Sequence, residues 1–587
     1  MVIRKVDVVI VGAGPTGLTM ALELALHQVS FSIVEKSPSP SDKSRALVLH
    51  PRSLELLRRH GIADDLMRRG TLGTGARVFV NKKKAAVFNF TDLGFDHTAF
   101  PQPLWISQAE TEALLLSRLQ SYGVEVERGV TAEGFEQDES GVTVTLSKDG
   151  VTGHIRCAYV IGCDGAHSVV RRSAGLSFEG AAYPQDFILC DAHLKWDQFE
   201  DEGRHISMFT GGKEVLILFP LPDGVVRLVG NLPSGTLSGS RSGLAPTLED
   251  FQSLFNRMAP GKWELSDPVW LANFRLHHRG VDNYRKGRCF VAGDAAHIHS
   301  PAGGQGMNTG IQDAINLGWK LAHTLRVHKA GGTVMETWLD SYNEERHRVG
   351  QHLLEGTDRL FSYASSTNTL WIWWRNFLLT WIMPWALSRR KLRARLFRFI
   401  SELGIRYRQS SIVGTSPHFM GQLKGGDRAP DGKIRMPDGV TKFLLETCAG
   451  NKFHFLLFSG RGAQALGTEG MESCATRLKE SLEGKALDVP EAHEVYESTP
   501  PHPSAMMDVD GKLHKVYGFE EPGFVLVRPD AYIAYIGSHS DIDDFLIWIN
   551  HAVESPQGPS SAYSLPAPQV DIFSATSAKV NSFSPQL

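Results

Sequence analysis

The first forty residues alternate short apolar runs with a glycine-rich turn. The β-branched run Val6–Val11 predicts a buried parallel strand, and Phe31–Val34 predicts a second strand that ends at Glu35. Between them, Leu18–Leu26 is rich in Ala, Leu, Met and Glu, which favour a helix. Strand, turn, helix and strand in this order predict the start of an α/β domain with a parallel sheet.

The pattern of this domain continues further along the chain. Ser107–Glu110 fits a capping box, so we expect a helix that runs on through Ala113–Leu119. A glycine-rich loop at Pro301–Gly310 precedes a helical run at Ile311–Leu325. Further apolar runs predict strands at Val124–Glu127, Val142–Leu146, Ile155–Ile161 and Arg288–Ala292.

Residues 178–280 have a different character. Apolar runs such as Phe187–Cys190, Val215–Pro220 and Val225–Gly230 alternate with Gly, Pro and Asp turns. This pattern predicts an antiparallel sheet in a separate lobe, which strands near 75–105 are expected to join. We therefore expect one α/β domain, formed by residues 1–177 and 281–410, that this lobe interrupts.

After about residue 410 the pattern restarts and indicates another domain, at 411–553. Its strand-like runs and its helix lie at Phe453–Phe458, Gly523–Val527, Ala531–Ile536 and Asp541–His551. Residues 554–587 are rich in Ser and Pro with few charges, which predicts a flexible tail.

Composition narrows the function classes. The chain has 587 residues, 42% hydrophobic and 21% charged residues and a net charge of −3, which is typical of a soluble globular protein and gives no sign of a nucleic-acid partner. The six cysteines form no CxxC pair, and no signal peptide is recognised at the N-terminus. We therefore expect reduced thiols and a cytoplasmic protein.

The turn after the first strand carries a dinucleotide-binding pattern. Gly12, Gly14 and Gly17 form GxGxxG, with a strand before it, a helix after it and Glu35 about twenty residues on. Gly12 permits the tight turn, Gly14 lets the backbone approach a pyrophosphate, and Gly17 lets helix and strand pack closely. Glu35 can accept hydrogen bonds from ribose hydroxyls.

Three further segments indicate which dinucleotide binds. They are Val160–Ser168, a strand ending in Asp-Gly; Phe290–His297, a strand ending in Gly-Asp; and the loop Pro301–Gly310. With these motifs in this order, the chain resembles the para-hydroxybenzoate hydroxylase-fold flavoproteins, and within them the phenol hydroxylase and aromatic polyketide hydroxylase branch. The resemblance extends over essentially the whole chain and implies an FAD-binding domain with a substrate lobe.

The resemblance also implies roles for individual residues. Asp294 would hold ribityl hydroxyls of FAD, and Gly303–Asn308 would wrap the isoalloxazine. Asp164 and Gly165 lie in the motif used around both FAD and NAD(P)H. The predicted cofactor-binding set is Gly12, Gly14, Pro15, Thr16, Gly17, Glu35, Lys36, Arg45, Gln108, Asp164, Gly165, Gly293, Asp294, Pro301, Gly304, Gly306, Met307 and Asn308.

The expected reaction has two halves. NADPH or NADH reduces FAD, and the reduced flavin adds O2 at C4a to give a hydroperoxide that hydroxylates a phenolic or aromatic polyketide-type substrate. We expect Pro301 near the reactive edge of the flavin, and Tyr183, Arg275 and His277 as candidates to face the substrate. Epoxidation or Baeyer–Villiger oxidation of a polyketide stays open, and a non-catalytic flavin-fold carrier is the alternative from another class.

Two further features of the sequence have no part in the expected reaction. His297 and His299 form an H-x-H pair, but no set of further ligands surrounds it, so no metal is expected. The Trp-rich segment Trp371–Leu387, followed by a basic run, predicts a helix packed on the body or at a homodimer interface, or else a peripheral membrane contact.

The C-terminal domain resembles the thioredoxin-like appendage of phenol hydroxylases. The resemblance rests on Gly426–Asp431 and Val525–Asp530, and those relatives often have Gly where this chain has Ala531. Because Cys448 and Cys474 form no CxxC pair, we expect a structural role for this domain.

Overall fold

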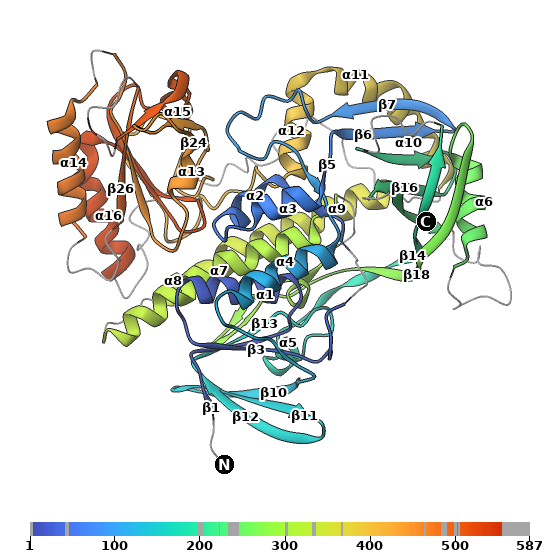
Figure 1. Cartoon of the computed structure of the whole chain (residues 1–587), viewed down its shortest axis with the longest axis horizontal. Coiled ribbons are helices and arrows are strands. Elements are labelled where there is room, and N and C mark those ends of the chain that lie inside the picture. The colour runs from blue at the N-terminus through green and yellow to red at the C-terminus, as the bar shows by residue number, and fades with distance from the viewer. Residues whose placement is uncertain are drawn as a thin grey trace, which may run out of the picture.

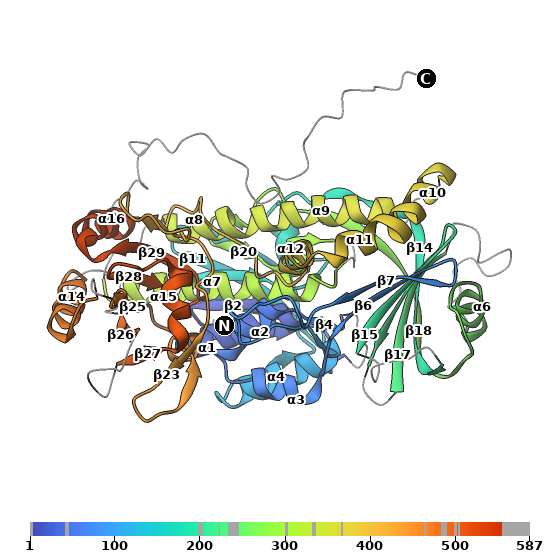
Figure 2. The ribbon, with the colours of Figure 1, turned by 90° about the horizontal axis from the view of Figure 1, so that it is seen from above.

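A computed structural model describes residues 4–41, 46–197, 204–221, 224–232, 246–299, 303–331, 336–364, 368–462, 465–482, 490–497, 502 and 505–554. The α/β fold class with an added sheet lobe, predicted above, is confirmed. In both ribbon views the sheet lobe and the C-terminal domain lie at opposite ends of the central domain (Figures 1 and 2).

A six-stranded sheet of order β19-β20-β13-β2-β3-β9 forms the centre. Its neighbours are parallel except for the edge pair of β19 and β20. The strands are β2 (Val8–Val11), β3 (Phe31–Glu35), β9 (Glu127–Arg128), β13 (Tyr159–Gly162), β19 (Arg285–Lys286) and β20 (Cys289–Val291). Helices α1 (Pro15–Leu26), α4 (Gln108–Gln120) and α7 (Gly306–Lys329) contribute the apolar side chains that complete its core.

Three predicted elements need correction. The predicted strand Ile155–Ile161 is two strands in different sheets, β12 (Val151–Cys157) and β13, because the chain leaves one ladder at Ala158. The predicted strand Val124–Glu127 is wrong over its first three residues, since only its last residue pairs with β3. The predicted loop Pro301–Gly310 ends early, because α7 already begins at Gly306.

Two smaller sheets complete the central domain. One contains β1 (Arg4–Lys5), β12 (Val151–Cys157), β11 (Gly141–Lys148) and β10 (Thr131–Asp138). The other contains β4 (Val48–Leu49), β8 (Leu104–Trp105) and β5 (Thr71–Leu72). Short helices accompany them: α2 (Pro51–Arg58), α3 (Ala63–Arg69) and α5 (Val169–Ser173).

The lobe is an eight-stranded sheet of order β21-β18-β14-β17-β16-β15-β6-β7. Its strands are β21 (His297–Ile298), β18 (Trp263–Gly280), β14 (Glu179–Trp196), β17 (Val225–Leu232), β16 (Val215–Pro220), β15 (His205–Thr210), β6 (Gly75–Val80) and β7 (Lys83–Asn89). Helix α6 (Leu248–Met258) packs on it through a shared apolar core. The expectation of an antiparallel sheet fails at one pair, because β6 enters from the first part of the chain and lies parallel to β15.

A run of helices follows α7 and precedes the C-terminal domain in the chain. It contains α8 (Glu336–Tyr342), η4 (Asn343–His347), α9 (Arg348–Ala364), α10 (Thr369–Phe377), η5 (Leu378–Ile382), α11 (Met383–Ser388) and α12 (Arg390–Ile400). No helix among the described residues is both long and apolar enough to cross a bilayer.

The C-terminal domain has its own eight-stranded sheet, of order β22-β29-β28-β25-β26-β27-β23-β24. The strands are β22 (Gly414–Thr415), β29 (Ile533–Ser538), β28 (Gly523–Val527), β25 (His454–Phe458), β26 (Glu491–Tyr496), β27 (Met506–Asp508), β23 (Lys433–Arg435) and β24 (Thr441–Phe443). Its helices include α13 (Leu444–Thr447), α14 (Thr468–Glu480), α15 (Lys512–Tyr517) and α16 (Ile542–Glu554). Its thioredoxin-like relationship and the domain boundaries stay predictions, and the predicted tail lies outside the described residues beyond Glu554.

Candidate functional site

The glycine turn between β2 and α1 has one open position and two closed ones. A Cβ on Gly17 would overlap the Gly12 carbonyl oxygen, and Gly12 itself has φ +102° and packs against the backbone of Cys163. By contrast, a Cβ on Gly14 would meet no atom within 4 Å. Gly12 and Gly17 therefore hold the turn together, while the backbone at Gly14 is accessible to a ligand.

Glu35 lies beside this turn, at the end of β3. Its Oε2 accepts a hydrogen bond from the Ala13 N–H at 2.9 Å, and its Oε1 accepts one from the Ser37 N–H at 2.9 Å. A carboxylate has about four lone-pair sites, so both oxygens can accept further bonds. Lys36 is exposed next to it, whereas Arg45 lies outside the described residues.

The Gly-Asp motif lies against the same turn. A Cβ on Gly293, at φ +59°, would come within 2.5 Å of the Thr16 hydroxyl, and one on Gly310 would overlap that hydroxyl too. Thr16 of α1 therefore fits between two glycines that follow it by almost three hundred residues. Asp294 is exposed on the short 3-10 helix that starts at Gly293. The first and second glycine motifs thus form a single site.

The third motif leads into the N-terminus of α7. Asn308 is buried, and its side-chain amide donates to the carbonyls of Val48 at 2.8 Å and Gly304 at 3.0 Å. Its Oδ1 accepts from the His50 N–H at 2.8 Å. The side chain of Asn308 therefore shapes the loop, which leaves its backbone for the predicted cofactor contact.

His50 is a residue that the sequence reasoning missed. Its Nε2 donates to the Gly303 carbonyl at 2.8 Å, and burial lowers the pKa of His50 to about 4, so the imidazole is neutral. It stands directly before the Pro-Arg-Ser-Leu segment that starts α2. The sequence signal that could have pointed to His50 is its position directly before Pro51, the first residue of a helix.

Asp164 has a structural task beside its predicted one. Its Oδ2 accepts from the N–H groups of Val169 at 2.6 Å and Val170 at 3.4 Å, and thus caps α5. Burial raises the pKa of Asp164, and its buried Oδ1 has no hydrogen-bond partner among the residues that the structure describes. Gly165 follows at φ +76° with open space around its Cβ direction.

Gln108 joins α4 to the chain before β4. Its Oε1 accepts from the Ala46 N–H at 3.2 Å, and its Nε2 donates to Glu112 at 2.8 Å. The capping box predicted there is half confirmed, because the Ser107 hydroxyl accepts from the Glu110 N–H at 3.1 Å.

Behind the site lies a buried layer centred on Asp313. Asp313 accepts from the Gly293 N–H at 3.0 Å, from His297 at 2.8 Å and from Arg346 at 2.7 Å. Burial alone would raise the pKa of Asp313, but Arg346 and His297 hold it below its usual value. His297 therefore belongs to this layer. No sequence pattern linked Asp313 with Arg346.

The predicted substrate-facing residues come from the central lobe strands. Tyr183 lies on β14 and Arg275 on β18, two neighbouring strands whose register shifts between Ala182 and Asp186. Only the backbone of Tyr183 and Arg275 is described, and Pro301 lies outside the described residues. The backbone therefore brings Tyr183 and Arg275 to one region of the lobe, and their roles stay predictions.

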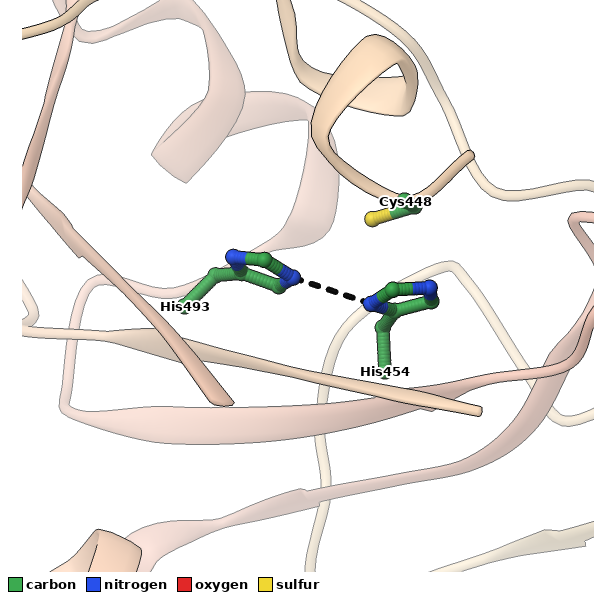
Figure 3. A group of neighbouring side chains, drawn as sticks. All are labelled: Cys448, His454 and His493. Carbon is green, nitrogen blue, oxygen red and sulfur yellow. Dashed lines mark hydrogen bonds between the residues drawn. The ribbon is translucent and has the colours of Figure 1, made fainter. Parts of the chain in front are cut away.

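One group of described side chains has ligand atoms close enough for a metal ion: Cys448, His454 and His493 in the C-terminal domain (Figure 3). The two imidazoles already share a hydrogen bond of 2.9 Å. Burial raises the pKa of Cys448 to about 12, and a thiol must be deprotonated to bind a metal. In this arrangement the group is a histidine pair beside a protonated thiol, and the expectation of no metal stays a prediction.

The residues of the glycine site suit a dinucleotide. Neither α1 nor α7 has an acidic residue in its own first turn, so the positive ends of both helix dipoles favour an anionic ligand. Open backbone at Gly14 fits a pyrophosphate, and the exposed Asp294 carboxylate can accept from hydroxyl groups. FAD therefore fits this site.

Comparison with known proteins agrees with this site. Residues 5–357 match the family model described as FAD binding domain. The 6-methylpretetramide 4-monooxygenase of Streptomyces rimosus is 32% identical over 551 residues, which cover 91% of each chain. The uncharacterized aromatic compound monooxygenase YhjG of Bacillus subtilis is 31% identical, over 82% of this chain and 90% of its own.

Solved structures extend the likeness to the C-terminal domain. The OxyS anhydrotetracycline hydroxylase from Streptomyces rimosus matches 94% of this chain and 99% of its own, with a TM-score of 0.69 and 28% identity. The flavin-dependent monooxygenase PieE, solved with FAD and substrate, has a TM-score of 0.76 at 21% identity and covers 93% of this chain and 99% of its own, which shows the shared fold. The chain therefore belongs to the FAD binding domain family and is an FAD-dependent monooxygenase.

Proposed function

We propose that this enzyme uses NADPH or NADH and O2 to hydroxylate a phenolic or aromatic polyketide-type substrate. The observation that carries the proposal is the contact of Thr16 with both Gly293 and Gly310, because it unites three motifs of an FAD-dependent hydroxylase in one site. Relatives that cover most of the chain support the substrate class, since one is named for 6-methylpretetramide and another for anhydrotetracycline.

When bound, FAD accepts hydride from the nicotinamide and activates O2 for transfer to the substrate ring. The protein supplies binding and orientation. The N–H groups at the start of α1 would bind the pyrophosphate, Glu35 the ribose, and Asp294 the ribityl hydroxyls. We propose Gln108, Lys36 and Arg45 as further contacts to the dinucleotide.

The substrate side belongs to the lobe in this proposal. Tyr183 and Arg275 would bind and orient the ring, and Pro301 would lie near the reactive edge of the flavin. Asp164 and Gly165 would serve both FAD and the visiting nicotinamide. Epoxidation and Baeyer–Villiger oxidation use the same site, so the product and not the cofactor distinguishes them. A non-catalytic carrier is disfavoured, because the three glycine motifs lie together in one site.

The test is oxidation of NADPH and NADH by the purified flavoprotein with a panel of phenols and aromatic polyketides, followed by mass and NMR analysis of the product. We expect substrate-dependent NAD(P)H oxidation and a product one oxygen heavier, with the new hydroxyl on the ring. Asp294→Ala should lose bound FAD and turnover, because each hydrogen bond to a charged group contributes about 1.5–3 kcal/mol. Wild-type flavin content in that variant would refute the assigned role of Asp294.

For partners, we propose a small aromatic substrate and O2, together with a contact made by the Trp-rich helices. The alternatives for this contact are a homodimer and a membrane surface. The C-terminal domain is proposed to be thioredoxin-like in fold and structural in role.

A further inference from the structure

Helices α10, η5 and α11 expose a large aromatic surface. Leu370, Trp373, Trp381 and Trp385 are 74%, 58%, 70% and 60% exposed, and no residue of α10 is buried. We name this the tryptophan surface; its exposed apolar members are Leu370, Trp371, Trp373, Trp374, Phe377, Leu378, Trp381, Ile382 and Trp385. The chain has 12 tryptophans, and among the described residues all those that are mostly exposed lie here. These side chains do not pack on the body, and the role of the segment stays a prediction.

The exposure does not come from a loosely attached helix. Leu379, Leu387 and Phe397 insert into the apolar core beneath these helices, together with side chains of β6 and β7. Arg375 donates to the Gly212 carbonyl at 2.6 Å, and Asn376 donates to the Gly211 carbonyl at 2.8 Å. These contacts hold the helices on the lobe, where α11 lies beside β7 (Figure 2), while the side chains of the tryptophan surface stay exposed.

The charge of this region is one-sided. Residues 368–400 contain seven Arg or Lys and no Asp or Glu. Arg389 stands over the Trp385 ring at 4.6 Å, so the cationic run directly borders the aromatic surface. Arg389, Arg390, Lys391 and Arg395 are exposed.

These features select one occupant. Exposed tryptophans beside cations are the composition of helices that lie in the headgroup region of anionic bilayers. A second copy bound through the same surface would bring Arg389, Arg390, Lys391 and Arg395 against the same four exposed cations, which opposes association. An apolar face without its complement on the protein marks an interaction site.

We propose that the tryptophan surface and its basic border dock this enzyme on an anionic membrane surface. Because η5 and α11 pack on β6 and β7, docking holds the substrate lobe against the leaflet. The substrate part of this proposal rests on the proposed function. The aromatic ring that is hydroxylated enters from the bilayer, so the substrate is a lipophilic, membrane-partitioned aromatic compound.

The test uses the FAD-loaded enzyme and sedimentation with phosphatidylcholine vesicles, with and without phosphatidylglycerol. We expect binding to the anionic vesicles only, with quenching of tryptophan fluorescence by lipids brominated near the headgroup. Each of Arg389→Gln, Lys391→Gln and Arg395→Gln should weaken binding about fivefold, since a basic residue near such a surface contributes about 1 kcal/mol. The double change Trp373→Ser, Trp381→Ser should abolish both binding and most of the quenching.

The matched control is Lys148→Gln, Val151→Ser. It removes one exposed cation and one apolar side chain, 72% exposed, from the β11–β12 hairpin at the bottom of Figure 1, away from α10 and α11. This variant should bind vesicles like the wild type. No sedimentation with anionic vesicles would overturn the proposal. So would a dimer in analytical ultracentrifugation that Trp381→Ser dissociates while vesicles stay unbound.

The experiment distinguishes a failure of membrane docking from a failure of the proposed hydroxylation. Vesicle binding needs no substrate, so it can succeed in an enzyme that oxidises none of the aromatic panel. If docking holds, turnover of a bilayer-partitioned phenol should rise with anionic vesicles in the wild type and not in the tryptophan double variant. Equal turnover in both would overturn the substrate inference and leave docking standing.

Discussion

Helix α7 has two regions that differ in their polar groups: its N-terminus, where the backbone is open, and the turns around Asn316 and Lys320, where charged side chains are buried. At its N-terminus the glycine loop leaves backbone open and the neighbouring Asp294 exposed. Three turns further, Lys320 and Asn316 meet Glu345, and Glu345 pairs with Arg528 of the C-terminal domain at 2.7 and 2.9 Å. There, the side chains of Lys320, Glu345 and Arg528 are at most 1% exposed.

The contrast separates binding from structure. Open backbone at a positive helix end is suited to a ligand, whereas buried ions that are fully paired hold two domains together. Arg528 also bonds Asp530 at 2.9 Å, so two cations and two anions balance inside the interface. The C-terminal domain is therefore held against the FAD domain by ion pairs beside α7.

The largest effect should come from breaking the buried network. Glu345→Ala leaves Lys320 and Arg528 buried without their shared partner, which should cost about 3–5 kcal/mol of unfolding free energy. Burial alone would raise the pKa of Glu345, but Arg528 and Lys320 hold it well below its usual value. Its stabilisation is thus present above the unfolded pKa of about 4.3 and should fade as the pH falls below it. In denaturant titration, the exposed control Glu355→Ala should have the unfolding free energy of the wild type. A Glu345→Ala variant as stable as this control would contradict the pairing.

The glycine turn offers the next sharpest contrast. Gly17→Ala forces a Cβ into the Gly12 carbonyl and should destabilise the fold, by about 1–3 kcal/mol or more for a rigid neighbour. Gly14→Ala meets open space, so the apoprotein should fold with a wild-type melting temperature while losing bound FAD. The ratio of flavin to protein absorbance measures this. A Gly14→Ala variant with full FAD would mean that the pyrophosphate lies elsewhere.

Glu402 contacts α7 between its two regions and should show a pH signature. It accepts from Thr309 and Gln312, and burial raises the pKa of Glu402 to about 8. The folded protein therefore keeps a proton that the unfolded chain releases above about 4.3, so stability should fall as pH rises from 5 to 8. In Glu402→Gln the decrease in unfolding free energy between pH 5 and 8 should be smaller than in the wild type by on the order of 2–4 kcal/mol. Parallel stability curves for wild type and variant across this range would refute the assignment.

The smallest effect concerns the turn that presents Arg528 and Asp530 to α7. Ala531 has φ +56°, a left-handed conformation that costs a non-glycine residue about 1–2 kcal/mol. Ala531→Gly should relieve this strain and stabilise by a few tenths of a kcal/mol after the larger entropy of the unfolded glycine is subtracted. A calorimetric melting temperature below that of the wild type would argue against strain at this position.

Local motifs explain how much could be predicted. Val8–Val11 and Phe31–Glu35 form the expected strands, since β-branched runs are readable over a few residues. The sequence shows a family pattern at Gly426–Asp431 and Val525–Asp530, but it does not show what the arginines of these two segments bind. Arg428 pairs with Glu55 at 2.9 Å across the domain interface, as Arg528 does with Glu345.

The sequence by itself determined the FAD domain, because its glycine motifs stand next to strand or helix signals that can be recognised locally. The tertiary structure alone decided three other things: that Ile155–Ile161 divides between two sheets, that Asp313 and Arg346 support the Gly-Asp motif from behind, and that the tryptophans of α10 face outward. The reason is common to all three. Pairing partners, buried ion pairs and exposure depend on residues far away in the chain, and no local pattern of apolar and polar positions records them.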